Sequence, residues 1–171
     1  RNGALETRSG VLLGKSGPPV NIEILTGPET SKGGAPLQPP PEIRVVDAGN
    51  TLVFGPVEIT AIIENNPTGL ASLSGNVALV MNGTAKFTQL AIDKSGPAYV
   101  LRFQGGSAFS LTEPFDLVVG PAARLFVDQQ PGISVFGVNI VPAPRVVVLD
   151  AGNNWVTSST VEIHARLLLP A

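Results

Sequence analysis

Hydrophobic and polar residues alternate along most apolar stretches of the chain. In the range 57–64, with the sequence VEITAIIE, the residues at odd positions are apolar and most residues between them are polar. A period of two is typical of a β-strand with one buried face. The same reasoning places Tyr99, Leu101 and Phe103 on one buried face, and Phe115, Leu117 and Val119 on another. The pattern predicts strands near residues 20–25, 42–47, 57–64, 76–81, 84–90, 98–104 and 113–119.

Two short polar segments between these strands have the composition of tight turns. Asn82-Gly83 separates two apolar stretches, and this dipeptide favours the type I′ turn of a two-residue hairpin. Asp47-Ala48-Gly49-Asn50 follows an apolar strand, and we expect Gly49 to adopt a positive φ angle there.

The chain contains an internal repeat. Residues 18–50 align without a gap with residues 121–153, and Asp47-Ala48-Gly49-Asn50 recurs unchanged as Asp150-Ala151-Gly152-Asn153. The alignment predicts a complete repeat at 18–120, preceded at 1–17 by the tail, or last strand, of an earlier repeat. It assigns 121–171 to the first half of a following repeat. The tail is inferred because Val11-Leu12-Leu13-Gly14 resembles the end of the complete repeat.

Composition narrows the classes of function. Charged residues make up 14% of the chain and the net charge is −2, without a basic cluster, so nucleic-acid binding is not expected. No apolar run approaches the roughly 20 residues of a membrane span, so this segment is not expected to insert into a membrane. Cysteine is absent, which excludes disulfides and thiolate chemistry. The 19 glycines and 16 prolines indicate many turns, as in an all-β protein.

The repeated residues resemble a known group of proteins. The run from Ala123 to Thr160, with Gln130-Pro131-Gly132 and the repeated Asp-Ala-Gly-Asn turn, is similar to tandem bacterial-type immunoglobulin-like repeats of large surface proteins and adhesins. Related repeats occur in algal surface proteins and in flagellar-hair filaments. The resemblance implies tandem immunoglobulin-like antiparallel β-sandwiches in an extracellular, cell-surface location.

Two further expectations follow from this resemblance. The segment Asp93–Gly96 followed by Tyr99 resembles the tyrosine corner, in which a tyrosine hydroxyl bonds to the backbone shortly upstream. The proline run Pro39, Pro40 and Pro41 is similar to extracellular algal and plant segments that are hydroxylated and glycosylated.

Few residues are candidates for catalysis or for binding a cofactor. His164 is the only histidine. Alternation places it outward with Glu162 and Arg166, while Val161, Ile163 and Ala165 point inward. A general base needs partners, and the sequence supplies no such pattern, so no catalytic residue and no cofactor is expected. We expect Trp155 to pack near the next interface, and the Gly33-Gly34 and Gly105-Gly106 segments to form loops.

Two motifs allow alternative interpretations. Asp47, Asn50, Asp150 and Asn153 could supply oxygen ligands to calcium, although the same residue types are common turn formers. Asn82-Gly83-Thr84 matches an N-glycosylation acceptor, and it also suits a hairpin turn without any sugar.

The main functional hypothesis is a structural, non-enzymatic repeat of an extracellular filament or surface stalk. Its partners would be other repeats of a longer chain, further copies in a filament, and glycans. One alternative is an adhesive module that recognises a glycan or protein through its loops. Another is a non-catalytic sandwich appended to a secreted enzyme.

The partial repeat carries its own prediction. It has strands only near 122–128, 144–149 and 160–169, and these cannot cover the apolar run Val146–Leu149. We therefore expect an open strand edge and an exposed apolar face, which further chain or another copy would complete.

Overall fold

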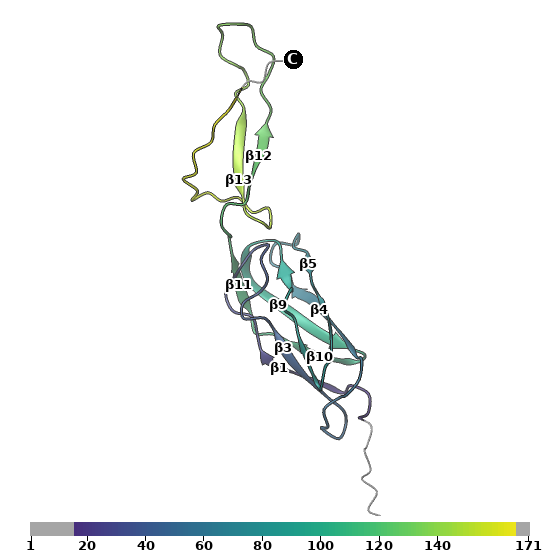
Figure 1. Ribbon diagram of the computed structural model, residues 1–171. Helices are drawn as coiled ribbons and strands as arrows, with labels where there is room; N and C mark the ends of the chain where they lie inside the picture. Colours follow the sequence, from purple (N-terminus) through teal and green to yellow (C-terminus); the bar gives the residue numbers. More distant parts are fainter. Residues whose placement is uncertain (1–15, 167–171) are drawn as a thin grey trace, which may run out of the picture.

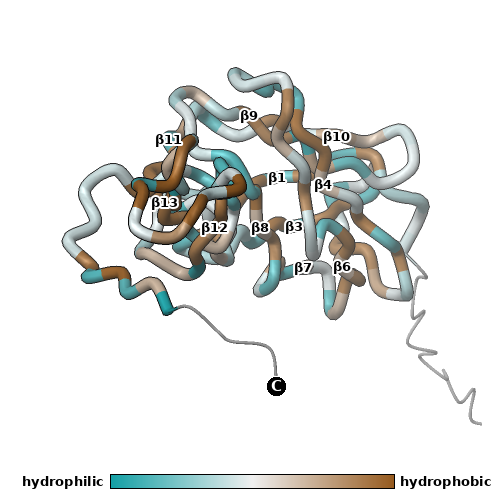
Figure 2. Tube along the Cα trace, turned by 90° about the horizontal axis from the view of Figure 1, so that it is seen from above, coloured by the Kyte–Doolittle hydropathy of each residue, from teal (hydrophilic) through white to brown (hydrophobic). Residues whose placement is uncertain are grey.

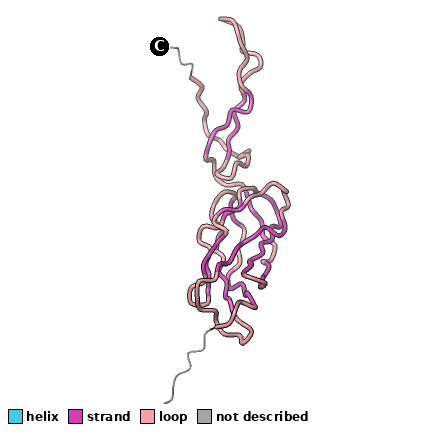
Figure 3. The backbone as a smooth tube through the Cα atoms, turned by 90° about the vertical axis from the view of Figure 1, so that its right-hand side faces the viewer, coloured by secondary structure: helices cyan, strands magenta, loops and turns pink. Residues whose placement is uncertain are grey.

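The computed structural model describes residues 16–166, and within them the protein consists of β-strands, turns and loops without a helix (Figure 3). The predicted all-β class is confirmed. Two predicted strands lie wholly or partly outside the described residues. They are Val11–Gly14 and the last part, residues 167–169, of the strand predicted at 160–169. No described residue from 160 to 166 is in a strand, so that part of the prediction for 160–169 is wrong.

The segment 18–120, called the middle segment below, contains two large sheets and one short two-stranded sheet. Its strands are β1 (Asn21–Thr26), β2 (Ser31–Lys32), β3 (Glu42–Val46), β4 (Glu58–Asn65), β5 (Leu73–Ser74), β6 (Val77–Leu79), β7 (Thr84–Lys86), β8 (Ala91–Ile92), β9 (Gly96–Gly105), β10 (Ala108–Leu111) and β11 (Phe115–Val118). One sheet has the order β1-β3-β7, and the other has the order β2-β11-β9-β4-β6, with β10 paired to β9. The short strands β5 and β8 form a separate pair.

The two large sheets share one hydrophobic core. Ile43 and Val45 of β3 are fully buried, and so are Tyr99, Leu101 and Phe103 of β9. The alternation of buried and outward residues along β4 and β9 follows the sequence pattern, because successive side chains of a strand point to opposite faces.

All seven strands expected in the middle segment are present, and β2, β5, β8 and β10 are additional. The prediction for Val119 is wrong, because β11 ends at Val118 and the Val119 side chain is exposed. The short strands were missed because two to four residues are too few to show a period.

The Asn82-Gly83 turn forms as predicted but joins strands of different sheets. Both residues have positive φ angles, 53° and 81°, and Met81 and Thr84 exchange two backbone hydrogen bonds across them. These features are those of a type I′ turn. However, β6 pairs with β4 and β7 pairs with β3, so the chain passes from one sheet to the other here.

The tyrosine hydrogen bond is also confirmed. The Tyr99 hydroxyl donates to the Lys94 carbonyl oxygen at 2.9 Å, while the ring is fully buried in the core. The bond satisfies a buried hydroxyl and ties the loop before β9 to the strand.

The internal repeat is present in three dimensions. The strands β12 (Arg124–Gln129) and β13 (Arg145–Leu149) lie 103 positions after β1 and β3. Leu125 pairs with Val148 as Ile22 pairs with Val45, and the register shifts at the equivalent place in each pair. The segment 121–166, called the C-terminal segment below, therefore repeats the first sheet of the middle segment.

The C-terminal segment lacks a second sheet among the described residues. Leu125 is 52% exposed where the equivalent Ile22 is 2% exposed, and Ile140 is 46% exposed where Leu37 is 1% exposed. Figure 1 shows the two segments end to end, and Figure 2 shows hydrophobic residues along β12 and β13. The exposed apolar face predicted for the partial repeat is present on β12. The prediction for the run Val146–Leu149 holds only in part, because Val146, Val147 and Val148 are half-buried and Leu149 is buried.

Replacement of the tyrosine hydroxyl should lower stability by a small, defined amount. Tyr99→Phe keeps the ring volume but leaves the Lys94 carbonyl without its partner, so we expect a loss of about 1 kcal/mol in the free energy of unfolding. Urea denaturation measures it. An unchanged midpoint would show that the bond contributes nothing.

Candidate functional site

The repeated Asp-Ala-Gly-Asn turn is organised by its aspartate. The Asp47 carboxylate accepts hydrogen bonds from the backbone N–H groups of Gly17 at 2.8 Å, Gly49 at 2.9 Å and Thr51 at 3.0 Å. Gly17 precedes the middle segment, so this carboxylate joins the end of β3 to the entering chain.

Asp150 repeats this arrangement 103 positions later. Its carboxylate accepts the N–H groups of Gly120 at 2.8 Å, Gly152 at 2.9 Å and Asn154 at 2.8 Å. The Asn154 side-chain amide donates to it as well. Asp150 is fully buried. Each aspartate thus holds the linker that enters its own segment.

The residue with positive φ in each turn is the asparagine, so the prediction for Gly49 is wrong. Asn50 has φ of 58° and Asn153 has φ of 65°. Asparagine is enriched in this left-handed region among residues other than glycine, which explains why the turn tolerates it.

Around Asp150, the turn also contacts loops of the middle segment. The Asn154 amide nitrogen donates to the Asp93 carbonyl oxygen at 2.8 Å, and its oxygen accepts the Ser95 N–H at 3.0 Å. Lys94 Nζ donates to the Gly152 carbonyl oxygen at 2.9 Å. These contacts, together with the Asp150 carboxylate, are called the junction below.

Glycines allow the backbones at the junction to approach closely. A Cβ atom added to Gly34, whose φ is 75°, would overlap the Gly152 backbone nitrogen. A Cβ added to Gly152 would overlap the Asp93 carbonyl oxygen. The Gly33-Gly34 segment is a loop as predicted, and it has this additional packing role.

Sequence reasoning missed Asp93, Ser95 and Asn154 as junction residues. The one available signal was the repeat itself, because Asn154 stands where the first turn has Thr51. The same turn is exposed at Gly49 and Asn50 in the middle segment but buried at Gly152.

Hydrogen bonding lowers the pKa of both aspartates. The Gly17 N–H contributes most to lowering the pKa of Asp47, followed by Thr51. Burial raises the pKa of Asp150, but the hydrogen bonds from Asn154, Gly120 and Gly152 outweigh it, and the net pKa is below the usual range.

This geometry favours the turn interpretation over the calcium interpretation. Both carboxylates are surrounded by N–H donors, whereas calcium requires six to eight oxygen ligands. Within residues 16–166, no three His, Asp or Glu side chains are grouped so that they could hold a metal ion.

The structure places the remaining candidates apart from the junction. Asn82 is exposed at its turn, whereas Pro41 is fully buried and Pro39 and Pro40 are partly buried. Burial makes Pro41 inaccessible to a modifying enzyme in the folded state. The glycosylation of Asn82 and the hydroxylation of Pro39, Pro40 and Pro41 stay predictions.

His164 is exposed beside Glu162, with its Nε2 at 3.6 Å from a carboxylate oxygen. The inward orientation predicted for Val161, Ile163 and Ala165 is wrong, because all three are exposed where no second sheet faces them. The packed position predicted for Trp155 is also wrong, since its side chain is 57% exposed.

No family model, curated protein or solved structure matches this chain. Among the described residues, no helix is long and apolar enough to cross a membrane.

A pair of equivalent glycines allows a matched test of the junction. Gly152→Ala places a methyl group against the Asp93 carbonyl oxygen, so we expect the two segments to reorient. Gly49→Ala, at the same position of the exposed turn, meets only an ordinary contact with the Asp47 carboxylate at 3.4 Å. Residual dipolar couplings measure the relative orientation of the segments. Equal couplings in both variants would contradict the role of Gly152.

The lowered pKa of Asp150 predicts a dependence of stability on pH. A carboxylate with a lowered folded pKa stabilises the protein above its unfolded value of 3.8, and this contribution is lost as the pH falls from there through the folded pKa. Asp150→Asn should therefore be less stable at neutral pH and lose less stability on acidification. Urea denaturation between pH 7 and pH 3 measures both effects. Glu113→Gln, at an exposed position, is the control.

Proposed function

We propose that this protein is a structural repeat segment of an extracellular filament or cell-surface stalk. The observation that carries the proposal is the junction, which fixes consecutive repeats to each other through Asp150, Asn154 and close glycine packing. Modules that act independently need only a flexible linker. A spacer needs its repeats held in one orientation, and a set of directional hydrogen bonds provides this.

The strand order supports the immunoglobulin-like part of the proposal. In chain order, β1, β3 and β7 correspond to strands A, B and E of such a domain, and β4, β9 and β11 correspond to strands C, F and G. The short strand β2 continues from β1 and pairs in parallel with β11, so the first strand is shared between the two sheets. The Tyr99 hydrogen bond agrees with this assignment.

The recurrence of the linker clamp supports a role in a longer array. Asp47 holds Gly17 in the way that Asp150 holds Gly120, so each repeat brings its own means of fixing the chain that enters it. A repeated clamp would give each step of the array the same geometry. The low charge content agrees with a surface that neighbouring repeats, sugars or partner chains cover.

A distance measurement between the segments tests the proposal. The chain contains no cysteine, so spin labels can be attached to Glu58→Cys on β4 and Gln129→Cys on β12, both exposed. We expect one narrow distance distribution from electron–electron double resonance. Adding Asn154→Ala removes the bonds to Asp93 and Ser95 and should broaden it.

Thr51→Ala provides the matched control, because Thr51 is the equivalent of Asn154 in the exposed turn. This variant should leave the distribution narrow. A broad distribution in the parent protein would mean that the segments are flexibly connected, which would refute a spacer role for the junction.

A further inference from the structure

Three asparagines among the described residues have positive φ angles, and all three are exposed. They are Asn50 with φ of 58°, Asn82 with φ of 53° and Asn153 with φ of 65°. Asparagine tolerates this conformation better than most residues that carry a side chain. Its side chain is also reactive, because the backbone nitrogen of the next residue can attack the amide carbon. The three turns differ in how they hold that nitrogen.

In the two Asp-Ala-Gly-Asn turns, the aspartate carboxylate holds the next nitrogen. The Thr51 N–H donates to Asp47 Oδ1 at 3.0 Å, and the Asn154 N–H donates to Asp150 Oδ1 at 2.8 Å. A hydrogen bond to a charged acceptor is stronger than one between neutral groups. The nitrogen that follows the asparagine therefore cannot turn toward the asparagine side chain without the loss of a strong bond.

The peptide unit between Asn82 and Gly83 has no such restraint. Among the described residues, neither the Asn82 carbonyl oxygen nor the Gly83 N–H takes part in a hydrogen bond. The two bonds of the turn join Met81 and Thr84, on either side of this unit. The Gly83 carbonyl oxygen belongs to the next peptide unit, and it accepts the Val45 N–H at 2.9 Å. The unit can therefore rotate without breaking a hydrogen bond.

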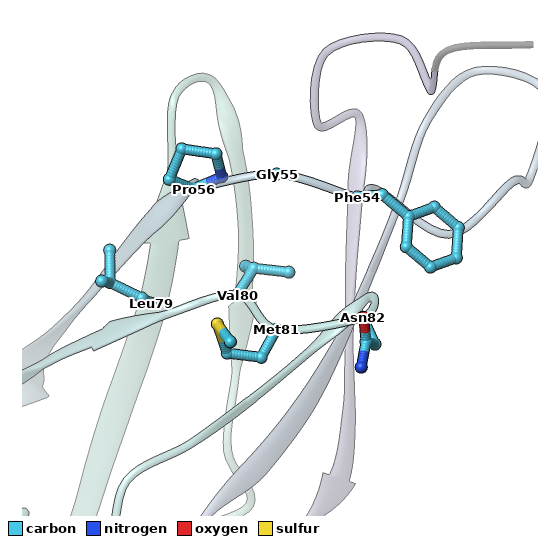
Figure 4. Close-up of a pocket in the computed structure, with 7 residues that line it drawn as sticks. All are labelled: Phe54, Gly55, Pro56, Leu79, Val80, Met81 and Asn82. Atoms are coloured by element: carbon cyan, nitrogen blue, oxygen red, sulfur yellow. The ribbon is translucent and has the colours of Figure 1, made fainter.

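Glycine at position 83 removes a second obstacle. A side chain there would hinder the attack of its own nitrogen, and glycine has none. The fold requires this glycine, because its φ is 81° and an added Cβ would lie 2.7 Å from the Leu52 Cβ. Gly83 itself is buried, but the Asn82 side chain is exposed and points away from the Phe54–Pro56 segment (Figure 4). Water therefore reaches the Asn82 side chain.

We propose that Asn82 is a site of spontaneous deamidation in the folded protein. The Gly83 nitrogen attacks Cγ of Asn82 and closes a succinimide ring. The Cγ–Nδ2 bond breaks, and Nδ2 leaves as ammonia with the proton of the Gly83 N–H. Water then opens the ring at Cγ to give aspartate, or at the backbone carbonyl carbon to give isoaspartate. The net reaction consumes water, releases ammonia and replaces the side-chain NH₂ by OH.

Either product changes the turn. Aspartate adds a negative charge to residues 77–83, which carry none. Isoaspartate adds a methylene group to the main chain between Met81 and Thr84, where the chain passes from one sheet to the other. Both products lack the amide to which a sugar would be attached, so Asn82 can be glycosylated only before it deamidates. This chemistry is independent of the proposed structural role.

Mass spectrometry of the full chain over time tests the proposal. The protein is produced without glycosylation and incubated in its folded state in mildly alkaline buffer. Peptides that contain Asn82 should gain the mass of an NH-to-O replacement, and an isoaspartate methyltransferase should label them. Asn50 and Asn153 should react at least roughly tenfold more slowly. Asn82→Gly, which tolerates the positive φ, is the control and should abolish the labelling at this turn.

Two variants separate the effect of the glycine from that of the restraint. Thr51→Gly places a glycine after Asn50 but leaves the N–H at position 51 bonded to Asp47, so Asn50 should still react roughly tenfold more slowly than Asn82. Adding Asp47→Ala removes the acceptor and should bring the rate at Asn50 close to that at Asn82. Circular dichroism of each variant establishes that the fold is retained, and Thr51→Gly alone is decisive if the double variant does not fold.

The chain unfolded in guanidinium chloride gives the reference rate for an unrestrained Asn-Gly pair. Folded Asn82 should react within roughly tenfold of this rate. If Asn82 stays unchanged in the folded protein while the unfolded chain reacts, the turn protects the pair and the proposal is overturned. Equal rates at Asn50 and Asn82 in Thr51→Gly would show that the carboxylate restrains nothing, which would refute the hydrogen-bond explanation.

Discussion

The carboxylate of the aspartate that follows β3, and of its equivalent after β13, makes the interaction on which the arrangement depends. One carboxylate accepts hydrogen bonds from N–H groups of the entering linker and of its own turn. Because the donors are backbone groups, the geometry of the linker is fixed relative to the sheet. At Asp150 the same carboxylate also orients Asn154, and through it the loops of the preceding segment.

Most of the fold could be predicted from the sequence. The alternation along residues 57–64 and 98–104 located the two longest strands, and the repeat predicted the correspondence of β12 and β13 with β1 and β3. The prediction that the Val161 and Ile163 side chains point inward was wrong for a physical reason. Alternation indicates which side chains share a face, but only a partner sheet can bury that face. The two repeats therefore share the register of their paired strands, although the equivalent side chains differ in burial.

The candidate site was harder to predict than the fold. The recurrence of Asp47 and Asp150 was evident, but the role of each carboxylate depends on backbone donors, which no side-chain pattern reveals. Asn154 gave a weak signal, because the change from Thr51 to an asparagine at the equivalent position is one substitution among many between the repeats. The partners Asp93 and Ser95 act through backbone atoms and lie about 60 positions earlier, where sequence spacing carries no information.

The parallel pairing of β2 with β11 has a mechanical consequence. The chain enters the middle segment near Gly17 and leaves it from β11, at opposite ends of that segment (Figure 1). A pulling force applied to the two ends would draw β2 and β11 in opposite directions along their common axis. The hydrogen bonds between them would then bear the load together in shear instead of opening one after another. A force that enters at Gly17 reaches this short contact only through β1, so the pairing of β1 with β3 and the pairing of β2 with β11 would resist extension of the segment in series.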